Sequence, residues 1–129
     1  MKSLILAAGV AAAAVSPSPV KLKSEAEIRN YWIFDFETTR PLLEEAGLDL
    51  LIPPELAKKH KGWGREYEIT IDSAGAVVSA RCLDCPADDP LQKTITRSTL
   101  LNRYKPAPGN QARTAITAPM QITLTPFGG

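Results

Sequence analysis

The sequence predicts a small α+β domain, with a three-stranded antiparallel sheet made of a hairpin plus a C-terminal strand, and helices packed on one face. Apolar and polar residues alternate over residues 66–71, and a turn and a second short strand follow directly. The same two-residue period returns over residues 114–125, and the stretch between these strands has a helical pattern. With 129 residues, the chain is long enough for one domain.

The composition is that of an ordinary globular protein. Hydrophobic residues make up 44% of the sequence, charged residues 22%, and the formal net charge is +1. This balance gives no reason to expect binding to nucleic acid or to an anionic membrane. The chain has a single histidine and no Gly-rich phosphate loop, so no nucleophile–histidine–acid set is evident. We therefore expect a protein that is not an enzyme and that needs no cofactor or metal.

The N-terminus has the features of an export signal. Lys2 precedes an apolar run of about twelve residues, whereas a membrane-spanning helix needs roughly 20. The alanines at residues 12–14 supply an A-x-A-like cleavage site. We expect residues 1–16 to be a cleaved signal peptide and the mature protein to be exported. A retained anchor or a buried helix is the alternative interpretation.

Residues 17–51 are expected to form a tether and short helices. The tether "SPSPVKLK" is followed by Ser-Glu-Ala-Glu, beginning at Ser24, which has the spacing of a capping box and predicts the start of a helix. The following "YWIFDF" is compatible with a helix or with an extended segment. "TRPLLEEAGL" predicts a helix with Pro41 near its first turn and Gly47 as its C-cap.

Residues 52–127 are expected to form the main domain, starting with a short helix in "PPELAKKHKG". The strand over residues 66–71 leads into a turn over residues 72–75, where Gly75 suits a positive φ, and the chain returns as a second strand over residues 76–81.

A helix and a last strand complete the domain. Asp88 or Asp89 is expected to cap a helix that has Pro90 in its first turn and ends near Arg103. In the last strand the even positions are mainly apolar and the odd positions mainly polar. Because Pro119 has no N–H to donate, we expect this strand to be an edge strand or to turn the Pro119 nitrogen outward.

Three segments, in this order, resemble the C-terminal domain of the TonB family of energy transducers: "IPPELAKKHKGWGREYEITIDSAGAVVSARC", "PLQKTITRSTLLNRYKPAPGN" and "APMQITL". The motifs that carry the resemblance are "PELA" at residues 54–57, the hairpin at 69–77, "RYKPA" at 103–107 and "APM" at 118–120. Together they cover about 75 of the 129 residues. The resemblance implies the fold and the binding of a peptide by strand addition. For an exported chain it also implies the periplasm of a Gram-negative bacterium.

The chain also departs from that family. Its apolar run is too short for an uncleaved membrane helix, and "SPSPVKLK" cannot replace a long Pro-rich arm that crosses the periplasm. Energy transduction is therefore not implied. Residues 24–51 and both cysteines lie outside the resemblance.

The resemblance places the binding surface on the last strand. The partner would be an envelope or outer-membrane receptor protein that contributes a peptide segment, and pairing of two copies through sheet edges is a further expectation. The candidate binding residues are Thr117, Pro119, Gln121 and Thr123. In the alternative interpretation, Pro119 and the threonines only protect the edge against aggregation, as in a purely structural envelope protein.

Cys82 and Cys85, the two cysteines of the chain, lie between the hairpin and the following helix. An oxidising compartment favours a disulfide between them. A periplasmic thiol–disulfide oxidoreductase is the alternative, but the helix is expected to begin several residues after Cys85, and the neighbouring Asp84 disfavours a thiolate. A metal site would need two more ligands, and His60 is the one histidine that the chain offers.

Overall fold

The computed structural model describes residues 18–48 and 63–123. The elements in chain order are β2 (Val20–Lys21), the 3₁₀ helix η1 (Glu25–Asn30), β3 (Trp32–Phe34), α2 (Phe36–Glu45), β4 (Gly64–Ile71), β5 (Val77–Cys82), α4 (Gln92–Leu100), β6 (Tyr104–Pro106) and β7 (Ile116–Thr123). The predicted signal peptide, the predicted helix in "PPELAKKHKG" and His60 lie outside the described residues. Within the described ranges, no helix is long and apolar enough to cross a membrane.

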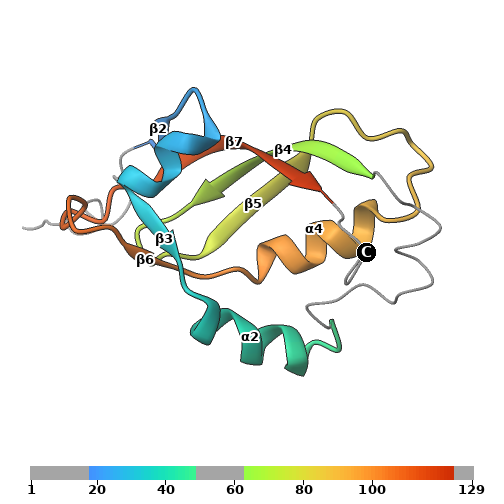
Figure 1. Ribbon diagram of the computed structural model, residues 1–129, viewed down its shortest axis with the longest axis horizontal. Coiled ribbons are helices and arrows are strands. Elements are labelled where there is room, and N and C mark those ends of the chain that lie inside the picture. Colours follow the sequence, from blue (N-terminus) through green and yellow to red (C-terminus); the bar gives the residue numbers. More distant parts are fainter. Residues whose placement is uncertain (1–17, 49–62, 124–129) are drawn as a thin grey trace, which may run out of the picture.

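The main sheet has four strands in the order β2-β7-β4-β5 (Figure 1). β4 pairs antiparallel with β5 and with β7, whereas β2 pairs parallel with β7. The predicted three-stranded antiparallel sheet is therefore wrong, because a fourth strand from the expected tether makes the sheet mixed. β2 has two residues, and so short a strand has no alternation that a sequence pattern could reveal.

A second, two-stranded antiparallel sheet joins β3 to β6, with Trp32 opposite Pro106 and Phe34 opposite Tyr104. The fold prediction did not include this sheet. The helix expected to run to Arg103 ends at Leu100, and the chain re-enters extended structure at Tyr104. Strands of three residues are again too short for a periodic signal.

The hairpin of β4 and β5 forms where the alternation predicts it. Tyr67, Ile69 and Ile71 are fully buried on one face of the sheet. Gly75 in the turn has a φ of 83°. A Cβ atom there would also collide with the Tyr104 carbonyl oxygen, so the turn needs glycine both for its backbone conformation and for space.

The buried side chains form two clusters on the same face of the sheet. The first joins β4 and β7 to η1 and β3 through Leu22, Ile28, Trp32, Ile69, Ile71, Val77, Ile116 and Ala118. The second joins β4 to the start of α4 through Trp63, Tyr67 and Leu91, with Ile95 packed against them. The opposite face of the sheet carries cross-strand polar pairs, such as Thr70–Thr117 (2.9 Å) and Arg81–Glu68 (2.6 Å).

The helix α2 starts earlier than predicted. Asp35 caps it by accepting a hydrogen bond from the Thr38 N–H, so Pro41 lies inside the helix and not in its first turn. Thr39 is buried, and its hydroxyl oxygen accepts a hydrogen bond from the Arg103 N–H at 2.8 Å. This bond ties α2 to the segment that leads into β6. Gly47, the predicted C-cap, has a φ of 74° but lies one residue later, because Ala46 is the C-cap.

Candidate functional site

The four predicted binding residues lie on β7, and each alternates with a residue that faces the core. Ile116 and Ala118 are buried, and Met120 and Ile122 pack against the two clusters. Thr117, Pro119, Gln121 and Thr123 therefore belong to the opposite face, as the period of two predicts. The alternation of β7 was thus predicted from sequence, whereas its place in the sheet was not.

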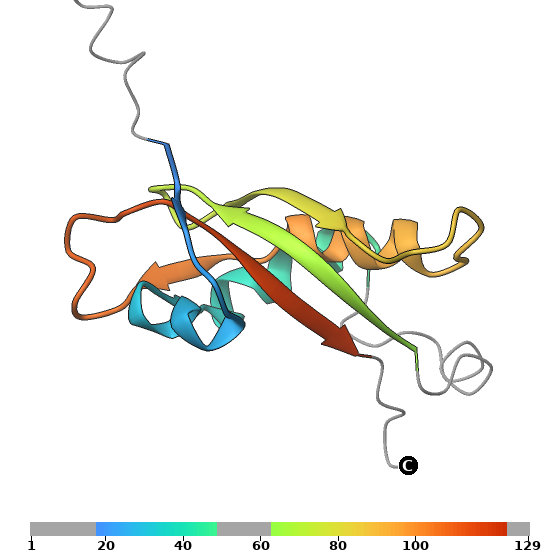
Figure 2. The ribbon, with the colours of Figure 1, turned by 90° about the horizontal axis from the view of Figure 1, so that it is seen from above.

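The outer edge of β7 is already occupied over much of its length. The Val20 N–H donates to the Ala115 carbonyl oxygen at 2.9 Å, and the Leu22 N–H donates to the Thr117 carbonyl oxygen at 2.8 Å. Figure 2 shows the N-terminal segment lying along the beginning of β7. The expectation that β7 is an outer strand is therefore wrong, since β2 lies outside it. The alternative, a Pro119 nitrogen that points away from β4, agrees with the alternation of the ladder.

Two further features block this edge at positions 119 and 121. Pro119 has no N–H, and the Gln121 N–H donates to a carboxylate oxygen of Glu25 at 2.9 Å. Thr117 and Gln121, two of the four predicted contacts, thus use outward-facing backbone groups to bind the N-terminal segment of the same chain.

β5 forms the other edge of the sheet, and no strand of the described residues pairs with its outer side. The Leu83 N–H donates to the Glu66 carbonyl oxygen at 2.8 Å. Because residues that bond to the neighbouring strand alternate with residues whose N–H and C=O groups point away from it, this bond indicates which residues of β5 face β4. By this alternation Arg81 also bonds toward β4, and the N–H and C=O groups of Ala80 and Cys82 point away from the sheet. The exposed side chains of Val78 and Leu83 stand at the two ends of this open edge.

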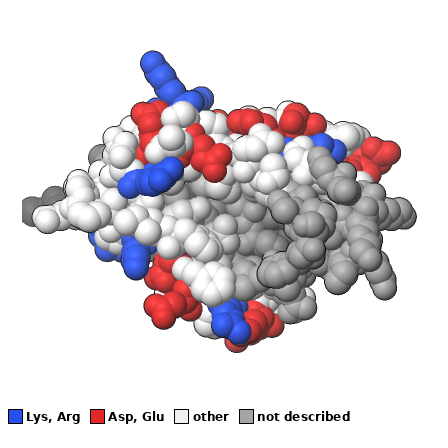
Figure 3. Space-filling model, viewed as in Figure 1, with Lys and Arg blue, Asp and Glu red and all other residues white. Residues whose placement is uncertain are grey.

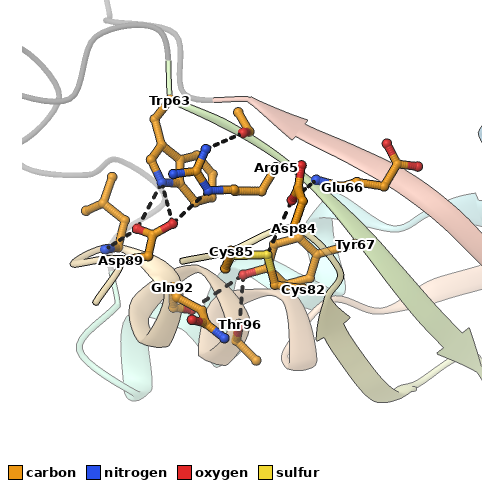
Figure 4. Close-up of polar contacts among 12 residues, drawn as sticks. Trp63, Arg65, Glu66, Tyr67, Cys82, Asp84, Cys85, Asp89, Gln92 and Thr96 are labelled. Atoms are coloured by element: carbon orange, nitrogen blue, oxygen red, sulfur yellow. Dashed lines mark hydrogen bonds and ion pairs between the residues drawn. A yellow bond between two sulfur atoms is a disulfide. The ribbon is translucent and has the colours of Figure 1, made fainter. Parts of the chain in front are cut away.

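β5 ends in a cross-linked corner (Figure 4). Cys82 and Cys85 lie at disulfide distance, with their Cα atoms 5.8 Å apart. Between them, Asp84 accepts a hydrogen bond from the Glu66 N–H at 2.9 Å. Just beyond the end of β5, this backbone N–H of β4 is therefore bonded to a side chain and not to a strand. The corner therefore fixes where the open edge stops.

Asp89 anchors the other side of this corner. Its side chain is 0% exposed and accepts hydrogen bonds from the Arg65 Nε at 2.8 Å, the Leu91 N–H at 3.0 Å and the Trp63 Nε1 at 3.1 Å. Burial by itself raises the pKa of Asp89, but the bonds from Leu91, Trp63 and Arg65 outweigh it and hold the pKa below its ordinary value of 3.8. Asp89 is thus an ionised structural carboxylate at the start of α4.

The tyrosine beneath the corner is also held in place. The Tyr67 hydroxyl lies 2.9 Å from the Thr96 hydroxyl (Figure 4). Burial raises the pKa of Tyr67, and the Asp89 carboxylate adds to this effect. A neutral phenol suits a packing residue.

The geometry of the cysteine pair does not favour redox catalysis. The helix α4 begins at Gln92, several residues after Cys85, so its N-terminus does not stabilise a thiolate there. The Asp84 carboxylate lies 3.7 Å from the Cys82 sulfur, and its negative charge disfavours a thiolate. Among the described residues, Cys82, Asp84 and Cys85 are the one group of three with metal-ligand atoms close together, and a disulfide takes both sulfurs from that group.

An open hollow of about 510 Å³ lies between η1, β3 and β7. Trp32, Phe34, Tyr104 and Met120 contribute to its wall, and η1 adds Glu25 and Arg29. Burial, together with Glu25, raises the pKa of Tyr104. In Figure 3 charged side chains lie mostly around the border of the visible face and uncharged ones nearer its middle.

Comparison with protein-family models, with curated proteins and with solved structures finds no match to this chain. The resemblance to TonB C-terminal domains therefore stays a prediction.

The residues that decide which edge is open were not predicted from the sequence. Glu25 and Gln121 are 96 positions apart, and no local pattern links residues at that separation. The capping box at Ser24 was the one available signal, because it fixes the start of η1 and therefore where Glu25 can reach.

Proposed function

We propose that this protein is an exported periplasmic binding module that takes an extended segment of an envelope or outer-membrane receptor protein as an added strand along β5. The observation that carries the proposal is the outer edge of β5, which pairs with no strand of the described residues. The backbone groups of Ala80 and Cys82 would bind the incoming strand, and hydrogen bonds to backbone give affinity with little dependence on sequence.

The difference between the two edges supports this choice of strand. The β7 edge combines a covering strand, a proline and a carboxylate bonded to a backbone N–H, all of which protect an edge against further pairing. The protection of β5 is limited to a single charged side chain, Arg81, and an irregularity in register beside Val78, without a proline or a covering strand. β5 is therefore the less protected of the two edges.

The side chains around β5 indicate what would confer selectivity. Val78 is 56% exposed and Leu83 is 49% exposed, so both are free to contact apolar side chains of a partner. Arg81 already pairs with Glu68 on the open face of the sheet, which leaves this part of the surface close to neutral. An extended segment with alternating apolar residues and little charge fits such an edge.

The test introduces charge at the two ends of the edge. N-terminal peptides from outer-membrane receptors of the same genome are titrated calorimetrically against wild type, against Val78→Lys with Leu83→Lys, and against Val20→Lys. Val20 is a matched control because it is 41% exposed on the opposite edge. We expect the double variant to weaken binding about tenfold or more, which is about 1.4 kcal/mol, and the control to leave binding unchanged.

Circular dichroism establishes that all three proteins fold. If Val20→Lys weakens peptide binding as much as the double variant does, the binding site is not at β5. If no receptor peptide binds the wild type, the proposed partner is wrong, and the alternative of a purely structural envelope protein is favoured.

A further inference from the structure

Three outward positions of β7, Thr117, Pro119 and Gln121, are blocked by the N-terminal segment or by the sequence of the strand. Thr117 pairs with Lys21 of β2 in register. Pro119, two residues on, has no N–H, and Gln121, after another two, donates to Glu25. Positions 117, 119 and 121 therefore offer no free donor to another strand, two of them because of the N-terminal segment and one because it is a proline.

The position of Glu25 is fixed by the start of η1. Glu27 accepts hydrogen bonds from the Lys23 and Ser24 N–H groups, both at 3.0 Å, which holds the chain as it turns from β2 into η1. Glu25 is the first residue of η1 and is exposed, so its carboxylate reaches Gln121 from outside the core. The acceptor that a neighbouring strand would supply is here supplied by a side chain.

We propose that residues 18–25 are an intramolecular guard that closes β7 to strand pairing, with Glu25 as the closing group, and that a second copy of this chain is the partner they exclude. Both residues of β2 are exposed, so β2 itself buries little apolar surface. β2 therefore contributes mainly by covering the outer edge of β7, while the buried Leu22 anchors the segment to the core.

A second copy is the appropriate partner because every copy carries the same edge. The central strand β7 has eight residues, and on its core side it is already paired with β4 over all of them. If its outer side were free, two copies could pair antiparallel through the same edge and continue the sheet. The inference concerns β7 alone and does not depend on the proposed binding at β5.

The first experiment is amide hydrogen exchange, resolved by residue, on the full chain. Glu25→Ala should speed exchange at Gln121 roughly fivefold or more, because one hydrogen bond is lost. Met120 and Ile122 are internal controls, since by the alternation of the ladder their N–H groups face β4. Glu25→Gln keeps an acceptor and should largely restore protection. Glu45→Ala removes an exposed acid of α2 and should change nothing at Gln121.

The second experiment opens the part of the edge that β2 covers. Val20→Pro removes the donor that bonds to Ala115, whereas the N–H of Lys21 points away from β7, so Lys21→Pro is the matched control. Sedimentation velocity over a range of protein concentrations should show self-association of the Glu25→Ala, Val20→Pro double variant, and none of the Lys21→Pro control beyond that of wild type.

Each result bears on the guard directly. Unchanged exchange at Gln121 in Glu25→Ala would overturn the role of Glu25. If the double variant shows faster exchange but associates no more than wild type, then residues 18–25 do not exclude a second copy of the chain. Their contacts with β7 would then serve only to stabilise the fold. If the double variant unfolds, the exposed single change Glu25→Ala is tested by the same sedimentation assay and decides the question.

Discussion

Asp89 shows how much a single side chain can hold together in this protein. Its buried carboxylate binds groups from the start of β4 and from the first residues before α4. Asp88 or Asp89 was predicted to cap a helix with Pro90 in its first turn, but α4 begins only at Gln92, and its N-cap is Leu91 without a side-chain cap. Asp89 instead accepts a hydrogen bond from the Leu91 N–H, just before the helix. Its bonds to Trp63 and Arg65 could not be predicted, because those partners are 26 and 24 residues away in the chain.

Replacing this carboxylate should be costly. We expect Asp89→Asn to lower the free energy of unfolding by about 2–4 kcal/mol, since Arg65 loses its charged partner and the new amide meets other donors. Asp88→Asn is the matched control, because Asp88 is exposed and adjacent in sequence. Urea unfolding followed by circular dichroism measures both, and equal stability of the two variants would contradict the anchoring role of Asp89.

The same residue predicts a dependence of stability on pH. The pKa of Asp89 is lower in the folded state than its ordinary value of 3.8, so the folded state favours the ionised form. Its contribution is therefore complete above pH 3.8 and is lost as the pH falls from there through the lower folded pKa. Wild type should lose stability in this range more steeply than Asp89→Asn. Parallel curves in urea titrations at several acidic pH values would argue against this linkage.

At the scale of elements, the length of each element decided whether the sequence could predict it. β4 and β7 have eight residues each, and their alternation was visible and correct. β2, β3 and β6 have two or three residues and gave no periodic signal, so the number and direction of the strands were wrong. Pro41 was misleading in a different way, because proline commonly marks the first turn of a helix but here lies inside α2.

The corner after β5 is the element on which the alternative function depends. The double change Cys82→Ser, Cys85→Ser should cost only about 1–2 kcal/mol of stability, because closing so short a loop restricts the unfolded chain little. Asp84 and Asp89 keep their backbone and side-chain bonds in this variant, so receptor-peptide binding should persist. Urea unfolding and peptide titration measure both effects.

An insulin-reduction assay completes that test. We expect no turnover by wild type, since Asp84 adjoins the sulfurs and no helix begins at Cys85. Turnover that the double serine variant loses would instead establish a thiol–disulfide oxidoreductase.

At the scale of the whole molecule, processing determines whether β2 is retained. We expect the mature N-terminus to lie between Ala13 and Val20, as the apolar run and the alanines indicate. Cleavage in this interval keeps Val20–Lys21 in the mature protein, so the sheet would remain four-stranded. Mass spectrometry of protein purified from the periplasmic fraction checks the terminus. An intact Met1 recovered with membranes would contradict both the cleavage and the proposed compartment.

The position of β7 also has a consequence for how the protein folds. β7 lies between β2 and β4, yet it comes last among the elements, after nearly all of the chain. Of the sheet, only the local hairpin of β4 and β5 can form early, and β2 has no neighbour until β7 arrives. The entropy cost of closing such long loops comes before any stabilising contact between the strands, and this makes folding slow. The ribosome or an export channel would therefore release a chain that has not yet assembled its sheet.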